Sequence, residues 1–250
     1  MDEIEYIYMY EEEERHWWYA GMRAIVLSLL RPISVQAGSM VLDAGCGTGY
    51  NMGWLKQHYG AIVTGLDLSP CALDFCRRRG ERTLVCADAA ALPFSGGIYD
   101  LVVSLDVIIS LKDEAARTAA MREFLRVLKP GGRLLIRVPA YEYLRSSHDT
   151  AVMVYHRYGK RELGSAARAA GFGVLRLTCS NTLLFPAAFL WRMLKNAGVA
   201  PAGSDVRGLT RGGDRLNRAA KSMLKLEAAI LRRFNLRFGL SIFLLAEKPK

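Results

Sequence analysis

The sequence lacks a hydrophobic run long enough to cross a membrane. Its most apolar stretch, Leu183 to Leu194, contains Pro186 and Arg192 and is shorter than the roughly 20 residues that a membrane-spanning helix needs. The N-terminus is acidic and has no early apolar core, which argues against a secretory signal. We therefore expect a cytoplasmic protein.

Cysteine and histidine are both scarce. The five cysteines are odd in number and contain no C-x-x-C pair, so we expect reduced thiols rather than a disulfide framework, and no metal site. Histidine occurs four times, and two of the four, His148 and His156, fall in one stretch after the fifth predicted strand. A lone histidine is most often a packing residue, whereas two together near acidic and aromatic residues favour a chemical role.

Charge is present but unevenly spread. The formal net charge is +10. Residues 1–14 carry seven acids and no base, whereas residues 207–237 carry nine Lys and Arg against two acids. This asymmetry leaves three interpretations open: the two segments attract each other, the basic segment meets an anionic partner, or it is the solvated face of a helix.

One stretch, residues 40–51 (MVLDAGCGTGYN), organises the rest of the chain. Apolar residues lead to Asp43, and glycine follows at the alternate positions Gly45, Gly47 and Gly49. This order indicates a buried strand, a tight turn that only glycine can make beside a ligand, and then a helix. The dinucleotide fingerprint has its third glycine one place later, so the spacing disfavours a nicotinamide oxidoreductase.

An acidic residue also ends the second predicted strand. Asp67 follows the apolar strand at 61–66 and lies 22 positions after Gly45. An acid about 20 positions after the glycine loop is expected to accept hydrogen bonds from ribose hydroxyls. The alternative is that Asp67 caps the helix that opens at Ser69-Pro70; the spacing favours the ligand role.

Further motifs follow in order along the chain. Acids end the strands predicted at 83–87 and 99–105. A helix is predicted at 114–128, and the phrase 126–132 (RVLKPGG) ends in a turn at 129–132 before a fifth strand at 133–138. Together with the glycine loop, this set resembles the class I S-adenosylmethionine (SAM)-dependent methyltransferases over residues 40–138. The resemblance implies a Rossmann-like, seven-stranded, mostly parallel sheet with an antiparallel last strand, SAM as the cofactor, and methyl transfer as the reaction.

The resemblance also implies which residues bind SAM. Arg23 would bind the methionine carboxylate, Asp67 the ribose and Asp88 the adenine amino group, while Cys46 would fill space in the loop. The face of an aromatic ring, such as that of Trp17, attracts a sulfonium cation. The predicted cofactor residues are Trp17, Arg23, Asp43, Gly45, Cys46, Gly47, Gly49, Asn51, Asp67, Leu68, Asp88, Ala89 and Leu105.

The acceptor side resembles a bacterial subgroup of the same superfamily, with Pro-Ala-Tyr at 139–141, His148-Asp149 and the triplet 156–158 (His-Arg-Tyr). Many relatives carry a Glu-His pair after the fourth strand, where this chain has Ile109-Ser110, so a base would have to come from elsewhere. An imidazole suits the removal of a hydroxyl proton. We expect catalytic roles for His156, His148 and Asp106, and acceptor contacts from Tyr10, Tyr19, Ile109 and Tyr158.

We expect a single methyltransferase domain over residues 1–250. Its parts would be an N-terminal helical arm at 1–31, a Rossmann-like core at 32–180 and 240–250, and a helical insert at 181–239. The insert separates strand six (173–180) from strand seven (240–246) and is too long to be a turn.

Within the insert, two helices are predicted. Residues 183–194 form an apolar helix, and the helical spacing of apolar residues from Leu216 to Phe234 indicates a basic amphipathic helix. The glycine-rich stretch at 200–213 between them would be mobile. The insert would act as a lid over the acceptor or, alternatively, make weak peripheral contact with an anionic membrane to reach a lipid-linked acceptor.

The expected function is methyl transfer from SAM to a small-molecule or amphiphilic acceptor, at oxygen, with a histidine base. The basic charge raises a nucleic-acid methyltransferase as an alternative. Against it, the fourth strand ends in Ser-Leu-Asp-Val-Ile (104–108) rather than the Asn/Asp-Pro-Pro-aromatic signature of enzymes that methylate planar amino groups, and no RNA-binding module is appended. A catalytically silent SAM-binding subunit is the alternative from a different class.

Overall fold

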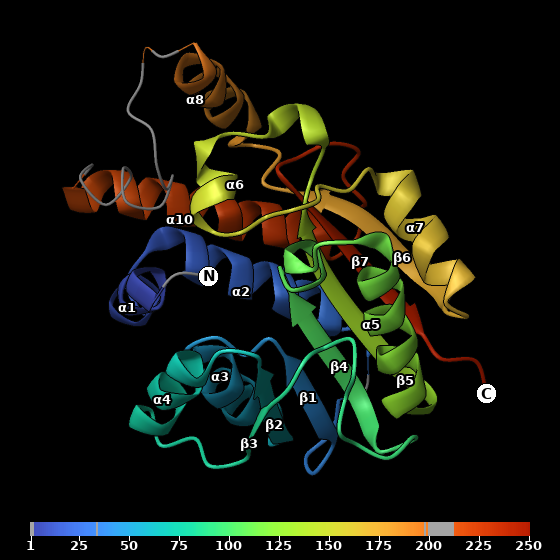
Figure 1. The fold of residues 1–250 in the computed structure, drawn as a ribbon. Helices are drawn as coiled ribbons and strands as arrows, with labels where there is room; N and C mark the ends of the chain where they lie inside the picture. The colour runs from blue at the N-terminus through green and yellow to red at the C-terminus, as the bar shows by residue number, and fades with distance from the viewer. Residues whose placement is uncertain (1–2, 34, 198, 200–212) are drawn as a thin grey trace. The chain divides into compact units, whose positions relative to one another are not determined.

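The computed structural model describes residues 3–33, 35–197, 199 and 213–250 (Figure 1). The glycine-rich stretch predicted at 200–213 lies, up to residue 212, outside the described residues. The chain divides into two compact units, which we call the arm–insert unit (Met1–Ile33, Pro139–Gly159 and Thr178–Ile242) and the sheet unit (Ser34–Val138, Lys160–Leu177 and Phe243–Lys250). The expectation that all 250 residues form one domain stays a prediction.

Seven strands form one sheet in the order β3-β2-β1-β4-β5-β7-β6. The four pairings among β1 to β5 are parallel. Gly131 N donates to Lys248 O and Ala140 N donates to Leu240 O, so β5 and β7 run in opposite directions. This confirms the predicted mixed sheet with an antiparallel last strand. The strands are β1 (Met40–Ala44), β2 (Ile62–Asp67), β3 (Leu84–Cys86), β4 (Tyr99–Leu105), β5 (Leu128–Pro139), β6 (Gly173–Ser180) and β7 (Ser241–Glu247).

The strand β5 begins five residues earlier than predicted. Residues 129–132, expected as a turn because of Pro-Gly-Gly, lie inside the strand. The pairing register with β4 shifts between Tyr99 and Leu101, and Gly131 has the positive φ of 76° that glycine tolerates. An irregularity of this kind lets a strand carry turn residues without ending.

Two helices of the sheet unit, α4 and α5, begin after a residue whose side chain caps them. Ser69 accepts a hydrogen bond from Ala72 N ahead of α4, and Asp113 accepts one from Ala116 N ahead of α5. Figure 1 shows α3 and α4 beside β1 to β3, and α5 and α7 beside β5 and β6. The helices are α3 (Tyr50–Tyr59), α4 (Pro70–Arg78), α5 (Glu114–Val127) and α7 (Lys160–Ala169), with the short 3-10 helix η1 (Ile108–Ser110) after β4.

The N-terminal arm, predicted to be helical over residues 1–31, consists of two helices. The helices α1 (Glu3–Glu12) and α2 (Trp17–Leu30) are separated at His16, whose buried side chain accepts a hydrogen bond from Trp18 N at 3.2 Å and so caps α2. Burial lowers the pKa of His16, as suits an imidazole that must stay neutral to accept this bond.

The insert is held together by a buried acid. Its helices are α8 (Phe185–Asn196) and α10 (Gly213–Leu231). Glu227 of α10 is fully buried and accepts hydrogen bonds from the backbone N–H groups of Asn181, Thr182 and Leu183, which lead into α8. Burial raises the pKa of Glu227, while these three bonds oppose the shift. The remaining elements of the arm–insert unit are η2 (Glu142–Leu144) and α6 (Ser147–Ala151).

In the part of the chain that the structure describes, no helix combines the length and apolarity that crossing a bilayer requires. This agrees with the absence of a long hydrophobic run in the sequence.

We expect Gly21→Ala to lower the free energy of unfolding, because α2 and α10 pack closely at this residue. A Cβ at Gly21 would lie 2.2 Å from Leu224 Cδ1 and 2.6 Å from Leu224 Cβ. Overpacking of this kind costs about 1–3 kcal/mol, more than the roughly 1 kcal/mol that alanine gains over glycine inside a helix.

Denaturant unfolding measures the effect, and Gly53→Ala is the matched control. Gly53 lies in α3, where a Cβ would meet only Glu81 Oε1 at an ordinary 3.5 Å. The penalty of Gly21→Ala should shrink in a Leu224→Ala background, which removes Cδ1, the atom of closest approach, although Cβ remains. Equal stability of the two alanine variants would show that the two helices are not in close contact at Gly21.

Candidate functional site

The glycine loop after β1 has a backbone that other residues would distort. Gly45, Gly47 and Gly49 have φ values of 86°, 55° and 83°, a region that L-residues rarely adopt. A Cβ at Gly45 would lie 2.1 Å from Val107 Cγ2. The N–H groups of Gly45 and Cys46 both donate to Leu66 O, at 2.6 and 2.9 Å, and join the loop to the end of β2.

Cys46, which lies within this loop, is buried beside a second thiol. Its Sγ lies 3.7 Å from Cys76 Sγ, and Cys76 Sγ in turn lies 3.2 Å from the carbonyl oxygen of Gly47. The hydrogen bond with Cys76 and burial both raise the pKa of Cys46. Because a thiol needs its thiolate form to react, these surroundings favour the predicted role of a small space-filling residue.

Asp67 connects the end of β2 to the glycine loop. Its Oδ2 accepts a hydrogen bond from Gly47 N at 3.0 Å, and its Oδ1 accepts one from Ser69 N at 2.9 Å. The helix α4 is capped by the side chain of Ser69, so the alternative role of Asp67 as that cap is not needed. A carboxylate oxygen has more than one lone-pair direction, which leaves Asp67 able to accept further bonds. The next residue, Leu68, is exposed.

The end of β3 lies beside the end of β2. Asp67 pairs in register with Cys86, and Ala87 N donates to Asp67 O at 3.2 Å. Asp88 follows, with its Oδ1 accepting from Ala90 N at 2.8 Å, and Ala89 is buried. The two predicted cofactor acids therefore come from neighbouring strands at one edge of the sheet.

Asp106 follows β4 with a left-handed backbone. Its φ of 61° is unusual for a residue other than glycine, and such conformations concentrate at functional sites. Its carboxylate pairs with the guanidinium of Arg137 in β5, with Arg137 Nε at 3.0 Å. Leu105, before it, is half-buried, while Ile109 in η1 is only 3% exposed.

These residues lie at the topological switch point of the sheet, where the strand order reverses. From β1, the chain first adds β2 and β3 on one side and then β4 and β5 on the other. Open parallel sheets bind ligands outside the carboxyl ends of their strands at such a switch point. Asp43 lies in β1, Asn51 lies at the start of α3, and the glycine loop connects them. The predicted cofactor residues from Asp43 to Leu105 therefore all belong to the sheet unit.

The predicted arm residues belong to the arm–insert unit, where Trp17 and Tyr19 pack against His16. The Trp17 ring centroid lies 5.3 Å from that of His16, and Trp17 N donates to Asn217 Oδ1 in α10 at 2.9 Å. Tyr19 meets His16 edge-on at 6.0 Å. Arg23 donates from Nη2 to Glu13 O at 2.9 Å, which uses one of its donors. Tyr10, in α1, is half-buried.

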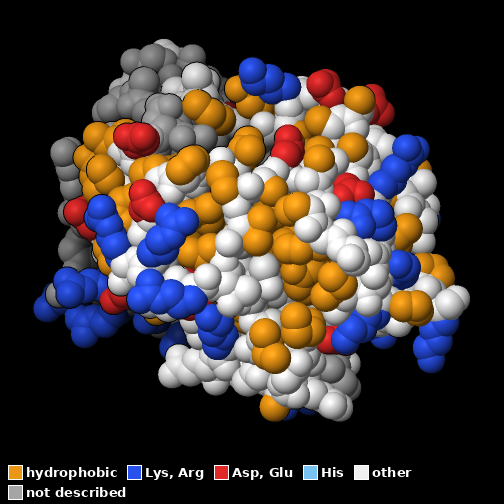
Figure 2. Space-filling view, turned by 60° about the horizontal axis from the view of Figure 1, so that its bottom comes forward, with side chains coloured by type: hydrophobic (Ala, Val, Ile, Leu, Met, Phe, Trp, Pro, Cys, Tyr) orange, Lys and Arg blue, Asp and Glu red, His pale blue; other side chains and the backbone are white. Residues whose placement is uncertain are grey.

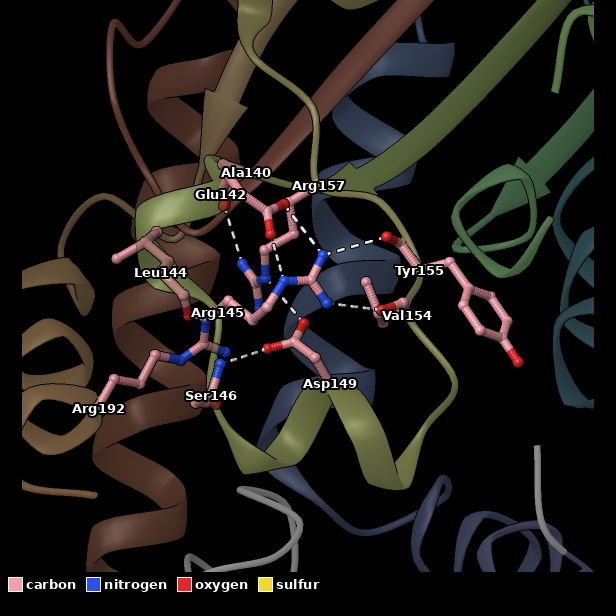
Figure 3. A network of polar contacts seen from close by, with 10 residues as sticks. All are labelled: Ala140, Glu142, Leu144, Arg145, Ser146, Asp149, Val154, Tyr155, Arg157 and Arg192. Atoms are coloured by element: carbon pink, nitrogen blue, oxygen red, sulfur yellow. Dashed lines mark hydrogen bonds and ion pairs between the residues drawn. The ribbon is translucent and has the colours of Figure 1, made fainter. Parts of the chain in front are cut away.

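The loop after β5 contains a buried ion pair that the sequence analysis missed (Figure 3). Arg157 Nε donates to Asp149 Oδ1 at 2.7 Å, and both side chains are almost fully buried. Asp149 Oδ2 accepts from Ser146 N at 2.8 Å, and Arg157 Nη1 donates to Ala140 O at 2.8 Å. Asp149 therefore has a structural role in this loop, although the sequence pattern grouped it with the candidate histidines.

Two further arginines bind main-chain carbonyls of the same loop. Arg145 donates to Val154 O at 2.9 Å and to Tyr155 O at 3.2 Å, and it forms an ion pair with Glu142. Arg192 of α8 donates to Leu144 O at 2.9 Å. Figure 3 shows the three guanidinium groups converging on the loop from both of its ends and from α8. The two arginines of the loop, Arg145 and Arg157, are visible in the sequence, but their spacing does not indicate which carbonyl groups they bind or that Arg157 is buried.

His156 lies in the segment that these contacts hold. Its ring meets the Tyr158 ring edge-on at a centroid distance of 4.6 Å. Tyr158 is buried, donates from its N–H to Pro139 O and accepts from Tyr141 N, so the segment runs beside the end of β5. His156 itself is half-buried.

The other histidines differ in setting. The second candidate, His148, lies in α6, and its side chain is outside the described residues. His58 is exposed in the last turn of α3, where its Nδ1 lies 3.0 Å from Trp54 O. Among the described residues, no group of three or more His, Cys, Asp and Glu is placed to hold a metal ion.

A family model described as a methyltransferase domain matches residues 42–136. The tRNA (carboxymethyluridine(34)-5-O)-methyltransferase alkbh8 of Xenopus tropicalis is 39% identical over 138 residues, which is 55% of this chain and 21% of that protein. Methyltransferase GfsG of Streptomyces halstedii is 36% identical over 115 residues, 43% of this chain and 40% of that protein. The chain thus spans well under half the length of either relative.

The fold also has counterparts among solved structures. One chain of a complex between the Haloferax volcanii Trm112 methyltransferase activator and a methyltransferase superposes with a TM-score of 0.64 over 98% of both chains, at 22% identity. This likeness supports the fold. The matched domain begins inside β1 and ends inside β5, so it contains the glycine loop, Asp67, Asp88 and Asp106.

Proposed function

We propose that this chain, which belongs to the class I SAM-dependent methyltransferases, transfers the methyl group of SAM to an oxygen of a small or amphiphilic acceptor, with His156 as the base. The observation that carries the proposal is the placement of His156, half-buried and edge-on to Tyr158, in a loop that three arginines hold in shape.

The donor set suits SAM. Asp67 offers carboxylate oxygens for the ribose hydroxyls, Asp88 offers one for the adenine amino group, and the glycine backbone lets a ligand lie against the loop. Arg23 would bind the methionine carboxylate. SAM, when bound, supplies a methyl group on a positively charged sulfur, so the protein's task is to align the acceptor and exclude water.

The reaction would be an in-line displacement. The acceptor oxygen forms a bond to the methyl carbon as the carbon–sulfur bond breaks, and S-adenosylhomocysteine leaves. The proton of the attacking hydroxyl goes to His156, because a hydroxyl is a weak nucleophile until its proton is removed. Tyr158 would fix the plane of the imidazole, and the Asp106–Arg137 pair would shape the end of β4 beside the reacting atoms.

A tRNA acceptor is the second candidate, favoured by the relatives. The Xenopus tropicalis and Arabidopsis thaliana relatives are named tRNA methyltransferases, and their names place the methyl on oxygen. The formal charge of +10 suits a polyanion, and Figure 2 shows Lys and Arg side chains gathered along the lower left edge of one face. Both candidates therefore share an oxygen acceptor and differ in the molecule that carries it.

A labelled-methyl assay tests the proposal. The purified protein is incubated with SAM that carries a labelled methyl group and with three acceptor pools: a protein-free small-molecule extract, a lipid extract and tRNA. We expect label in the first or second pool, with the product methyl identified as O-methyl by carbon NMR. Label in tRNA alone would replace the first candidate by the second, and label on nitrogen or carbon would remove the need for a histidine base.

A further inference from the structure

The helix α10 carries three distinct faces. One is buried and contains Ala220, Leu224, Glu227, Ala228 and Leu231; Leu224 packs against Gly21 of α2. Because residues seven apart lie almost above one another on a helix, the exposed positions sort into two further stripes. Each stripe has its own chemistry.

The first exposed stripe is apolar. Leu216 and Leu226 are 51% and 57% exposed, and Met223 is also exposed. Phe234 extends the stripe, since its N–H donates to Ile230 O in a continuing helical turn and its ring is exposed. Large apolar side chains clustered along one line on a surface mark a contact site rather than chance exposure.

The second exposed stripe is basic. It is made by Arg215, Arg218, Lys225, Arg232 and Arg233, all of which are exposed. The acid within this span, Glu227, is buried and bound to backbone N–H groups. The outer surface of α10 and of the turn after it, from residue 215 to 233, therefore presents positive charge alone, next to the apolar stripe.

We propose that these two stripes, together the outer face of α10, dock on the surface of an anionic lipid membrane. A helix that lies in the interface plane inserts an apolar side between the lipids while Lys and Arg meet the anionic headgroups. This partner uses both stripes at once. An RNA would pair with the Lys and Arg side chains but leave Leu216, Met223 and Leu226 exposed, because single-stranded RNA is bound by aromatic stacking and phosphate contacts.

The charge pattern also separates this face from the rest of the arm–insert unit. The α8 helix has exposed apolar side chains too, Phe189, Leu190, Trp191 and Leu194, but its central Arg192 is buried and bound to Leu144 O. Among the side chains of α8 and α10 that the structure describes, exposed Lys and Arg beside exposed apolar residues therefore occur in α10 alone. The contact would be peripheral, as expected for an element too polar to enter the bilayer core.

Vesicle co-sedimentation tests the proposal with the full-length protein. Vesicles of phosphatidylcholine alone and with phosphatidylglycerol are compared at low and moderate salt. We expect binding to the anionic vesicles, reduced by salt because the headgroup attraction is screened. Leu216→Gln with Leu226→Gln should weaken it roughly tenfold or more, and so should Arg218→Gln with Lys225→Gln.

Matched variants elsewhere serve as controls. Leu175→Gln removes an exposed apolar side chain from β6, and Arg82→Gln removes an exposed base near β3; both should bind vesicles normally. Thermal melts confirm that every variant is folded. Absence of binding to anionic vesicles at low salt, or equal binding to neutral ones, would overturn the proposal.

Competition with tRNA tests whether the outer face of α10 binds a nucleic acid instead of an anionic membrane. If tRNA displaces the vesicles and only the arginine and lysine variants lose binding, the face is a nucleic-acid surface and the membrane proposal is wrong. The methyl-transfer proposal is tested independently of this one, because none of these variants changes His156, Asp67 or the glycine loop.

Discussion

Replacement of Asp67 by alanine is expected to weaken SAM binding by about 1.5–3 kcal/mol, as for a lost hydrogen bond to a charged group, or roughly 10- to 150-fold in Kd. The structure provides two reasons. The carboxylate stands at the end of β2, where a ribose is expected, and its Oδ2 also accepts a bond from Gly47 N, so its loss would loosen the loop against which the ligand lies.

Calorimetry separates these two contributions. The affinities of S-adenosylhomocysteine and of its 2′,3′-dideoxy analogue are measured in the unmodified protein and in Asp67→Ala. If Asp67 binds the ribose, removal of the hydroxyls weakens binding to the unmodified protein but has little further effect in the variant. Asp74→Ala, an exposed acid of α4 paired with Arg77, is the control and should bind normally. Unchanged affinity in a folded Asp67→Ala protein would remove Asp67 from the ribose site.

The sheet edge could be predicted because its pattern is local. A parallel strand buried on both faces is a short apolar run in the sequence. The acidic residues that follow such runs mark the carboxyl ends of the strands, and therefore one edge of the sheet. The fourth and sixth strands match the predicted bounds, and the second and third differ by a residue or two. The loop geometry followed too, since alternate glycines indicate positive φ values without knowledge of the rest of the fold.

The break in the arm could not be predicted in the same way. Helix caps are usually Ser, Thr, Asp or Asn, and none of these stands between α1 and α2. The cap is His16, whose Nδ1 accepts a hydrogen bond from Trp18 N, and burial lowers the pKa of this imidazole. A sequence pattern records that a histidine is present, but its protonation state depends on packing.

The sequence analysis also failed to predict which charged residues are buried. Glu227 was counted with the surface charges of the basic segment, yet it is buried and binds three N–H groups more than 40 residues away in the sequence. Asp149 and Arg157 were placed near candidate chemistry, yet they pair with each other in the loop interior. Which charge is buried is decided by contacts between distant segments, and a single sequence does not show these.

Replacement of His156 by glutamine is expected to lower turnover by roughly 10²–10⁴-fold if it is the general base, with little change in SAM affinity. Glutamine keeps the size and polarity of the side chain, so the edge-on neighbour Tyr158 and the arginine-held loop should remain in place. The acidic limb of the pH–rate profile should disappear in the variant, an effect that loss of loop structure alone would not produce.

The remaining histidines make this test discriminating. His58→Gln changes an exposed histidine in α3 that bonds its own helix, and it should leave turnover unchanged. The turnover of His148→Gln, in α6, shows whether His148 contributes more or less to catalysis than His156. Normal turnover in both His156→Gln and His148→Gln would contradict a histidine base and indicate an acceptor that needs none, such as an amine or a carbanion. Because Asp149 is held by Arg157 and Ser146 N, a carboxylate would not readily replace the imidazole, and a large loss on removal of His156 is therefore the expected result.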